Sequence, residues 1–388
     1  MVTAGIVAEY NPFHSGHKYM IEQVRKKGAT HVAAVMSGAV VQRGDIAVFD
    51  KHFRAEKAVE NGVDLVVELP FPYSCSSGEL FARSAISILS GLGDNVVNKL
   101  AFGCECDDIN LLKKASEASM KLKDSQLVRK KLMQGLSYPD SVCQSACEIY
   151  GESVGDILKS PNNTLAVEYI KAAEELLPEA DFITVKRQYA EHDSDQAYEG
   201  ITSASHIRSL LSDRKRADEF CPYSFGGEPL FFLEKMEREV LFRLGCLEKA
   251  DFERLPNCSS ELADKIIKAM SECPENLFEF FRLCKSKNVT MARLRRGVMH
   301  CILGTEKTDM IPPPYVRILA FNKHGAEILK KCGGRLPVDT SLKALENSSE
   351  EAKRIIHLEN NGVRFQKFCT DREYKPQNEY RKSVRLMK

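Results

Sequence analysis

The chain has 388 residues, of which 43% are hydrophobic and 28% charged, and its formal net charge is +1. These values exclude a disordered chain, and no uninterrupted apolar run approaches the ~20 residues that a membrane helix needs. The near-neutral total excludes an overall polycation, so contact with a polyanion must come from local basic clusters. Because the first residues read as a strand rather than a signal peptide, we expect a cytoplasmic protein.

The 13 cysteines are too sparse for a disulfide scaffold, and their odd number leaves at least one unpaired. The closest pairs are Cys104/Cys106 and Cys143/Cys147. Neither has a second pair or histidines at the spacing of a tetrahedral zinc site. We therefore predict reduced thiols with structural roles and no metal-ligating residues.

Short apolar runs alternate with helix-like segments through the first half of the chain. Within each run the apolar character is continuous, which indicates strands buried on both faces and hence a parallel sheet covered by helices. Such sheets bind ligands at the carboxyl ends of their strands. The predicted fold class is α/β, with strands at 2–10, 31–36, 63–69, 100–103 and 182–185, a helix between the first two, and further helices near 53–61, 80–90, 163–177 and 203–211.

Composition also predicts how the chain is divided. The stretch at 108–150 is polar, rich in lysine and without strand signals, so we expect a helical insertion there. Residues 221–227 have linker composition, and helical periodicity with punctuating prolines dominates beyond them. We predict two domains, an α/β domain at 1–215 that carries the insertion and a mainly helical domain at 216–388.

Two histidines follow the first strand, in the block Asn11-Pro12-Phe13-His14-Ser15-Gly16-His17. If a helix begins near Ser15, His14 and His17 lie on one side of its first turn. The free amides of that turn and the positive end of the helix dipole suit a triphosphate, and Gly16 lets a ligand approach the backbone. The alternative is a helix capped by Ser15 with two exposed histidines.

A second block, Thr202-Ser203-Ala204-Ser205-His206-Ile207-Arg208, combines hydroxyls with an arginine at a helix start. Hydroxyls and amides can bind phosphate oxygens, while Arg208 can offer a planar set of donors to charge that builds on a leaving pyrophosphate. The alternative is a helix cap at Ser203 or Ser205 and a surface arginine at 208.

Together these blocks resemble the signatures of the HIGH-motif nucleotidyltransferase superfamily. The order and spacing of further stretches resemble one family within it, the bacterial tRNA(Met) cytidine acetate ligases. The resemblance implies a Rossmann-like nucleotidyltransferase domain with a helical insertion, followed by a mostly helical domain. The matching stretches are 7–17, 35–38, 41–45, 62–70, 102–105 and 160–163.

The resemblance also implies roles for individual residues. The catalytic set would be His14, His17, Ser205 and Arg208. Without the resemblance, Gly103 would be read as a strand-ending turn and Asn162 as a helix cap. The implied ATP-binding residues are Val7, Ala8, Glu9, Tyr10, Asn11, Pro12, Phe13, His14, Ser15, Gly16, His17, Lys18, Tyr19, Met20, Gly103, Asn162 and Arg187.

The implied reaction has two steps and needs no protein nucleophile. Acetate attacks the α-phosphate of ATP to give acetyl-adenylate and pyrophosphate, and the exocyclic amine of a cytidine then takes the acetyl group. The product is N(4)-acetylcytidine at the wobble position of elongator tRNA(Met). Catalysis would rest on positioning and on charge neutralisation by His14, His17, helix amides and a magnesium ion.

A tRNA substrate requires basic side chains gathered on the surface. Each candidate cluster can also be a solvated helix face. The candidates are Arg43, Lys51 and Arg54 near the nucleotide; Arg293, Arg295 and Arg296 in the helical half; the insertion lysines; and the tail with Arg372, Lys375, Arg381, Lys382, Arg385 and Lys388.

Two other functions remain open on the sequence. A small-molecule adenylyl- or cytidylyltransferase would share both phosphate motifs, but the about 170 residues beyond Leu211 favour a large substrate. A non-catalytic tRNA-binding protein with a degenerate site is a third alternative, and the intact His14, His17 and Arg208 argue against it.

Overall fold

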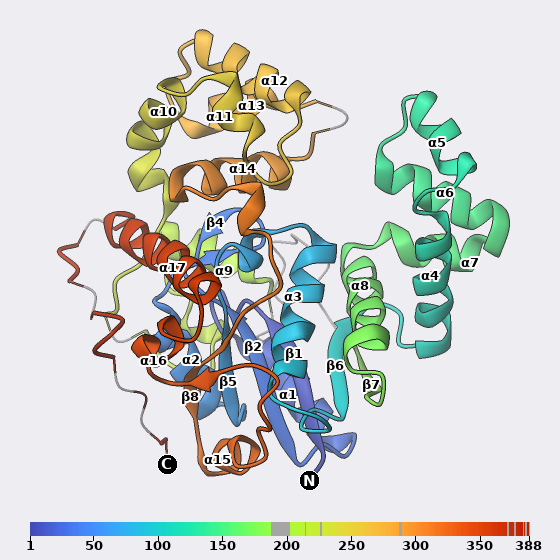
Figure 1. Cartoon of the computed structure of the whole chain (residues 1–388), viewed down its shortest axis with the longest axis vertical. Coiled ribbons are helices and arrows are strands. Elements are labelled where there is room, and N and C mark those ends of the chain that lie inside the picture. Colours follow the sequence, from blue (N-terminus) through green and yellow to red (C-terminus); the bar gives the residue numbers. More distant parts are fainter. Residues whose placement is uncertain are drawn as a thin grey trace.

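A seven-stranded sheet forms the centre of the molecule (Figure 1) in the computed structural model, which describes every residue except 188–201, 214, 226, 287–288, 371, 376–377, 383, 385 and 388. Arg385 and Lys388 of the basic tail therefore lie outside the described residues. The strand order is β7-β6-β1-β2-β5-β8-β9, and each neighbouring pair is parallel except β5 and β8. The strands are β1 (Thr3–Ala8), β2 (His31–Ser37), β5 (Leu65–Leu69), β6 (Lys99–Cys104), β7 (Asp181–Lys186), β8 (Val316–Phe321) and β9 (Val338–Asp339).

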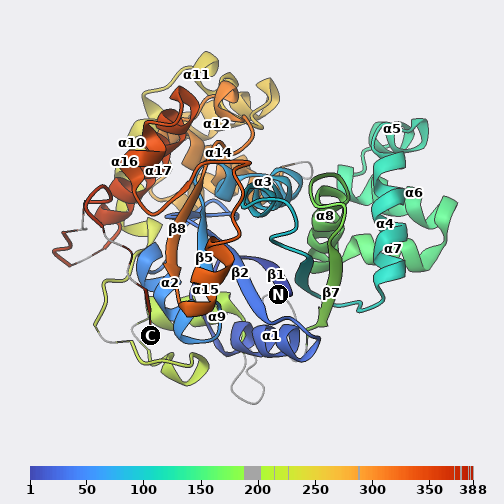
Figure 2. The same ribbon diagram turned by 60° about the horizontal axis from the view of Figure 1, so that its bottom comes forward.

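Helices cover both faces of this sheet, as the continuous apolar runs predicted. In β2, Ala33 and Val35 belong to one hydrophobic cluster, while Ala34 and Met36 belong to another. Both faces of the strand are therefore buried. The covering helices include α1 (Ser15–Lys26), α2 (Lys51–Glu60), α3 (Gly78–Gly91) and α8 (Pro161–Leu176). In Figure 2 the sheet lies between α3 and α8 on one side and α1 and α2 on the other.

The predicted insertion is helical and forms an arm to one side of the sheet (Figure 1). It is longer than expected because a further helix continues it to Lys159, with Gly151 at φ 94° allowing the turn between the last two helices. The helices are α4 (Ile109–Leu122), α5 (Gln126–Met133), α6 (Tyr138–Tyr150) and α7 (Glu152–Lys159).

The second half of the chain is mainly helical, yet it does not form a domain apart from the sheet. Five helices build a second arm, after which the chain returns and adds β8 and β9 beside β5. A boundary near residue 215 therefore does not separate the sheet from the rest. The helices are α10 (Glu237–Gly245), α11 (Lys249–Glu253), α12 (Ser260–Ser271), α13 (Leu277–Cys284), α14 (Met291–Leu303), α15 (Lys323–Leu329), α16 (Leu342–Glu346) and α17 (Glu350–Phe368).

Two small elements complete the surroundings of the site. A hairpin of β3 (Val40–Val41) and β4 (Asp45–Ile46) follows β2, and α9 (Ala204–Ser212) follows the residues after β7.

All 13 cysteines are free thiols, in agreement with the sequence prediction. Over the described part of the chain, no helix combines the length and apolar character that crossing a membrane requires.

Candidate functional site

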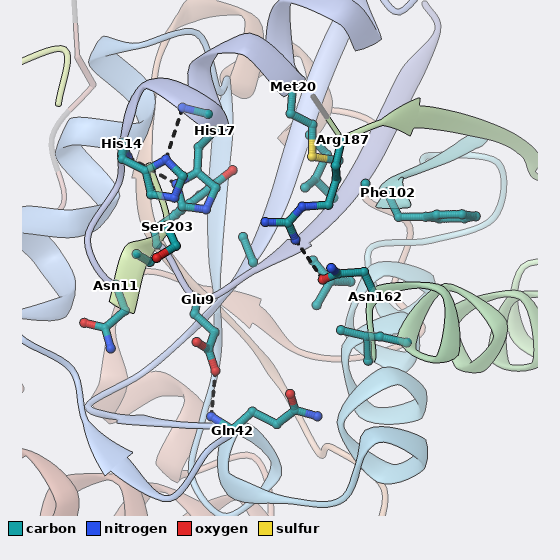
Figure 3. Close-up of a pocket in the computed structure, with 18 of the residues that line it drawn as sticks. Glu9, Asn11, His14, His17, Met20, Gln42, Phe102, Asn162, Arg187 and Ser203 are labelled. Carbon is teal, nitrogen blue, oxygen red and sulfur yellow. Dashed lines mark hydrogen bonds between the residues drawn. The ribbon is translucent and has the colours of Figure 1, made fainter. Parts of the chain in front are cut away.

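A cavity of about 320 Å³ opens at the carboxyl ends of the central strands, where α1 and α9 begin (Figure 3). Its volume lies within the range of small-molecule sites. Both helices begin at this region, and their dipoles favour a negative ligand there. The described residues of its wall include Ile6 to Asn11, His14, Gly16, His17, Tyr19 to Ile21, Gln42, Arg43, Phe81, Phe102, Gly103, Asn162, Leu165, Tyr169, Val185, Arg187, Thr202 to Ser205 and Arg208.

The two histidines cap the first turn of α1 and pack against each other with their rings tilted by 36°. Their ring centroids are 3.8 Å apart. His14 Nδ1 accepts a hydrogen bond from Gly16 N at 3.1 Å, and His17 Nδ1 accepts one from His14 N at 3.2 Å. A ring nitrogen that accepts carries no proton, so the proton of each neutral ring is on Nε2. Each histidine therefore keeps one N–H donor for a ligand, and the helix cap is His14 rather than Ser15.

Both histidines are neutral in the ligand-free protein. Burial, helped by the nearby guanidinium groups of Arg187 and Arg208, lowers the pKa of His14 to about 3. Burial also lowers the pKa of His17 well below its ordinary value, with His14 and Arg187 adding to the effect. The expectation that the histidines neutralise charge is thus corrected for the free protein, where they are hydrogen-bond donors and the arginines carry the positive charge.

The second motif faces the same cavity from α9. Ser203 caps the helix, because its hydroxyl accepts a hydrogen bond from His206 N at 3.1 Å, and it lies 2.9 Å from the hydroxyl of Ser205. Arg208 Nη1 donates to Asn11 O at 2.8 Å, which ties α9 to the loop after β1. The helix-cap alternative is correct for Ser203, but the cap also lies on the cavity wall, so the two interpretations are compatible.

On the opposite wall, Asn162 links two charged side chains. Arg187 Nη1 donates to Asn162 Oδ1 at 2.7 Å (Figure 3). Asn162 Nδ2 donates to Glu105 Oε1 at 2.6 Å. Asn162 is not the cap of α8, since Ser160 takes that place. Gly103 lies beside Arg187 near the end of β6, where it leaves backbone accessible to a ligand.

The loop after β1 has a backbone conformation and contacts that the sequence did not predict. Tyr10 has φ 46°, a conformation that residues other than glycine rarely adopt. Glu9 Oε1 accepts a hydrogen bond from Gln42 N at 2.8 Å, which joins this loop to the β3–β4 hairpin. Outside this loop, Thr202 of the cavity wall has a buried Oγ1 that lacks a hydrogen-bond partner among the residues that the structure describes.

Some expected ATP-binding residues do not line the cavity. Pro12 and Phe13 are buried, and Phe13 packs in the core beneath α1. Ser15 directs its hydroxyl to Phe220 O at 3.0 Å, and Lys18 lies exposed on the outer face of the helix. Within α1, residues three apart share a face of the helix, so Ser15 and Lys18 lie together on a side away from His17.

Lys51 and Arg54 cannot contact a surface ligand or tRNA, which corrects the sequence interpretation. Their exposed fractions are 1% and 0%. Lys51 Nζ lies 2.6 Å from Glu68 Oε1, 2.9 Å from Glu359 Oε1 and 3.2 Å from Glu379 Oε2. Arg54 donates to backbone carbonyls instead.

The other basic candidates divide into two kinds. Arg43 is exposed and lies on the cavity wall. Arg295 and Arg296 are half-buried and hold α14 against the β3–β4 hairpin, because Arg295 pairs with Asp45 at 3.2 Å and Arg296 donates to a hairpin carbonyl. Arg293 instead donates to Asn257 O, away from that hairpin.

Among the described residues, no three His, Cys, Asp or Glu side chains converge as a metal site would require. The cavity wall includes the carboxylate of Glu9 together with the guanidinium groups of Arg43, Arg187 and Arg208. The electrostatic character of the wall is therefore suited to an anionic ligand.

The parallel sheet, the paired histidines at the start of α1 and the hydroxyls and arginine at the start of α9 define a nucleotidyltransferase of the HIGH class. The sequence model of the HIGH Nucleotidyl Transferase family matches residues 1–381. A curated tRNA(Met) cytidine acetate ligase of Clostridium perfringens is 35% identical over 85% of this chain and 87% of its own length. One of Fervidobacterium nodosum is 32% identical over 92% and 88%. The chain belongs to the tRNA(Met) cytidine acetate ligase family.

Solved structures have the same fold. The crystal structure of Thermotoga maritima TmcAL bound with alpha-thio ATP aligns with a TM-score of 0.85 at 28% identity, covering 96% of this chain and 95% of the other. Its apo form aligns with a TM-score of 0.86 and covers 98% of that chain. The alignment extends over both arms and the sheet of this chain.

Proposed function

We propose that the protein is an ATP-dependent acetate ligase that forms N(4)-acetylcytidine at the wobble position of elongator tRNA(Met). One observation carries the proposal, namely the convergence of two helix starts, two neutral histidine donors and the guanidinium groups of Arg187 and Arg208 on one cavity. The names of the relatives and the alpha-thio ATP in the Thermotoga maritima structure support it.

In the first step an acetate oxygen attacks the α-phosphorus of ATP, and the bond to the β-phosphate oxygen breaks, giving acetyl-adenylate and pyrophosphate. His14 and His17 donate Nε2–H to phosphate oxygens, and Arg208 stabilises charge on the pyrophosphate. Ser205 adds a hydroxyl at the start of α9. Arg187 holds the nucleotide from the opposite wall, where Asn162 fixes its guanidinium.

In the second step the exocyclic amine of the cytidine attacks the acetyl carbon, AMP leaves, and the amine loses one proton. The wall holds no side chain that must become acylated, so the residues act by positioning and by stabilising charge. The phosphate of the departing AMP is itself a base next to the reacting amine and receives this proton.

The cavity wall fits a magnesium ion for which the protein supplies few ligands. Magnesium is usually held by one or two carboxylates together with substrate phosphates and water. Glu9 is a carboxylate on the cavity wall, and its Oε1 already accepts a backbone amide. The ion would neutralise phosphate charge while bound mainly to ATP.

The tRNA explains the size of the chain better than a small acceptor does. Two arms extend beyond the sheet (Figure 1), whereas a small-molecule transferase needs little more than the sheet and its helices. Elongator tRNA(Met) as substrate also fits a cytoplasmic protein.

The test is pyrophosphate release from ATP with acetate or tRNA omitted in turn. An acetate ligase releases pyrophosphate with acetate alone and gives acetylated tRNA only when both are present. Acetyl-AMP should replace ATP plus acetate, and acetyl-coenzyme A should not. Release that ignores acetate would point to a small-molecule transferase, and no release with tRNA binding intact would point to a non-catalytic protein.

A further inference from the structure

Two loops at the ends of β1 and β2 shape one wall of the cavity. The first contains Glu9 and Tyr10, and Tyr10 is held at φ 46° although it is not a glycine. The second contains Gly38 and Ala39 and leads into the β3–β4 hairpin. Strained backbone persists only where surrounding groups hold it, so side chains outside these loops must fix their conformation.

Arg54 of α2 bonds both loops at once. Its Nη1 donates to Glu9 O at 2.6 Å and to Ser37 O at 3.0 Å, and its Nη2 donates to Gly38 O. Its Nε donates to Phe49 O at 3.1 Å. One rigid, planar guanidinium thus ties the carboxyl ends of β1 and β2 together.

Glu359 reaches the same place from α17, more than 300 residues away along the chain. Its Oε1 accepts from Ala39 N at 3.1 Å and its Oε2 from Phe71 N at 2.7 Å, so it joins the ends of β2 and β5. A side chain at Gly38 would collide with both carboxylate oxygens. The glycine is therefore required by the carboxylate beneath it.

The position of Glu359 is fixed by buried charges. Lys51 Nζ donates to Glu359 Oε1, and the same lysine contacts Glu68 at the end of β5. Glu68 and Glu379 in turn pair with Arg317 of β8 at 3.4 Å and 2.7 Å. Because all these groups are nearly inaccessible to solvent, each one depends on its partners to remain charged.

We infer that Arg54 and Glu359 are positioning residues, which hold the two loops in the shape that binds nucleotide. The inference rests on the proposed function, since it assumes that the cavity binds ATP. Neither side chain lines the cavity. Arg54 bonds the backbone of Glu9, which does line it, and Glu359 bonds the start of the loop that leads to the lining residues Gln42 and Arg43. The C-terminal half of the chain thereby contributes to the nucleotide site through α17.

The test compares Glu359→Gln and Arg54→Lys with a matched control, Asp64→Asn. Gln replaces one acceptor oxygen by a donor, and Lys offers three donors from a single atom that cannot bridge both strand ends. Asp64 is equally buried and accepts from Arg25 Nη2 and Val32 N at 2.8 Å, but at the amino ends of β2 and β5, away from the cavity. ATP dissociation constants are measured by calorimetry, well below each variant's melting temperature.

We expect Glu359→Gln and Arg54→Lys to weaken ATP binding at least tenfold, and Asp64→Asn to change it less than twofold at a similar loss of melting temperature. Saturating ATP should restore kcat in Glu359→Gln, so the defect lies in the KM for ATP. Gly38→Ala retains every buried charge but displaces the Glu359 carboxylate, so it should show the same loss of ATP affinity. It replaces Arg54→Lys in the comparison where that variant does not fold. ATP affinity equal to that of Asp64→Asn in all these variants would overturn the inference, whereas a wild-type protein that binds no ATP would overturn the proposed function and the inference with it.

Discussion

Helices α1 and α2 both begin near the carboxyl ends of the central strands, yet the first turn of one faces the cavity and that of the other is buried. The first turn of α1 opens on the cavity and presents two neutral histidines. That of α2 is covered by α17, which turns Lys51 into the centre of a buried ion cluster. A basic residue at a helix start therefore indicates a ligand only where nothing else covers it.

The strongest way to break this comparison is to remove the charge of Lys51. Burial alone would lower the pKa of Lys51, but Glu359, Glu379 and Glu68 raise it above its ordinary value. Lys51→Met leaves these carboxylates without their shared partner and should cost about 3 to 5 kcal/mol in the free energy of unfolding. Lys130→Met, at an exposed position of α5, is the control and should stay within about 0.5 kcal/mol. Equal stability of both variants in denaturant titrations would mean that Lys51 is not part of a buried cluster.

Removing a histidine donor from α1 should instead affect turnover. His17→Ala loses one Nε2–H at the phosphates, which is expected to cost about 2 to 4 kcal/mol in the transition state, or roughly 30- to 1,000-fold in rate. The melting temperature should fall only modestly, because the loss to folding is mainly one capping hydrogen bond to His14 N. Pyrophosphate release with acetate measures the loss, and turnover near that of the wild type would remove His17 from the site.

The pH dependence of the free energy of unfolding tests whether His14 is neutral in the folded protein. Its pKa is lowered to about 3 in the folded protein, while the unfolded chain titrates near its ordinary value. The unfolded state thus binds more protons below about pH 6.5, and stability falls as the pH drops from there toward 3. His14→Asn keeps an N-cap acceptor but does not titrate, so it should lose up to about 2 kcal/mol less than wild type between pH 7.5 and 5. Parallel stability curves in urea would contradict the neutral state of His14.

The smallest effects are expected in the helical arm, where two arginines three residues apart differ. Arg293→Gln should reduce the salt dependence of tRNA binding by about one unit of slope and leave ATP binding unchanged. Arg296→Gln should also weaken ATP binding, because Arg296 donates to Gln42 O beside the cavity. Filter binding of tRNA at several salt concentrations, set beside ATP calorimetry, tests both. Equal ATP affinity of the two variants would mean that the hydrogen bond from Arg296 to the β3–β4 hairpin does not affect the ATP site.

Local patterns predicted the strands, the helices between them and the two ligand-facing blocks, because continuous apolar runs and helix-start residues depend on near neighbours. Contacts between distant segments were not predictable in this way. β8 follows a run of prolines that reads as a helix boundary, although it pairs with β5 in the sheet. Lysine and arginine are residue types that often bind phosphate. Only the packing of α17 shows that Lys51 and Arg54 have structural roles here.

The most direct test of the account is nucleoside analysis of tRNA(Met) after incubation with the protein, ATP and labelled acetate. The account predicts labelled N(4)-acetylcytidine at the wobble position, formed with one AMP and one pyrophosphate per acetyl group, and its loss in His17→Ala. Labelled nucleoside that appears only with acetyl-coenzyme A, or the absence of acetylcytidine while ATP is bound, would contradict it.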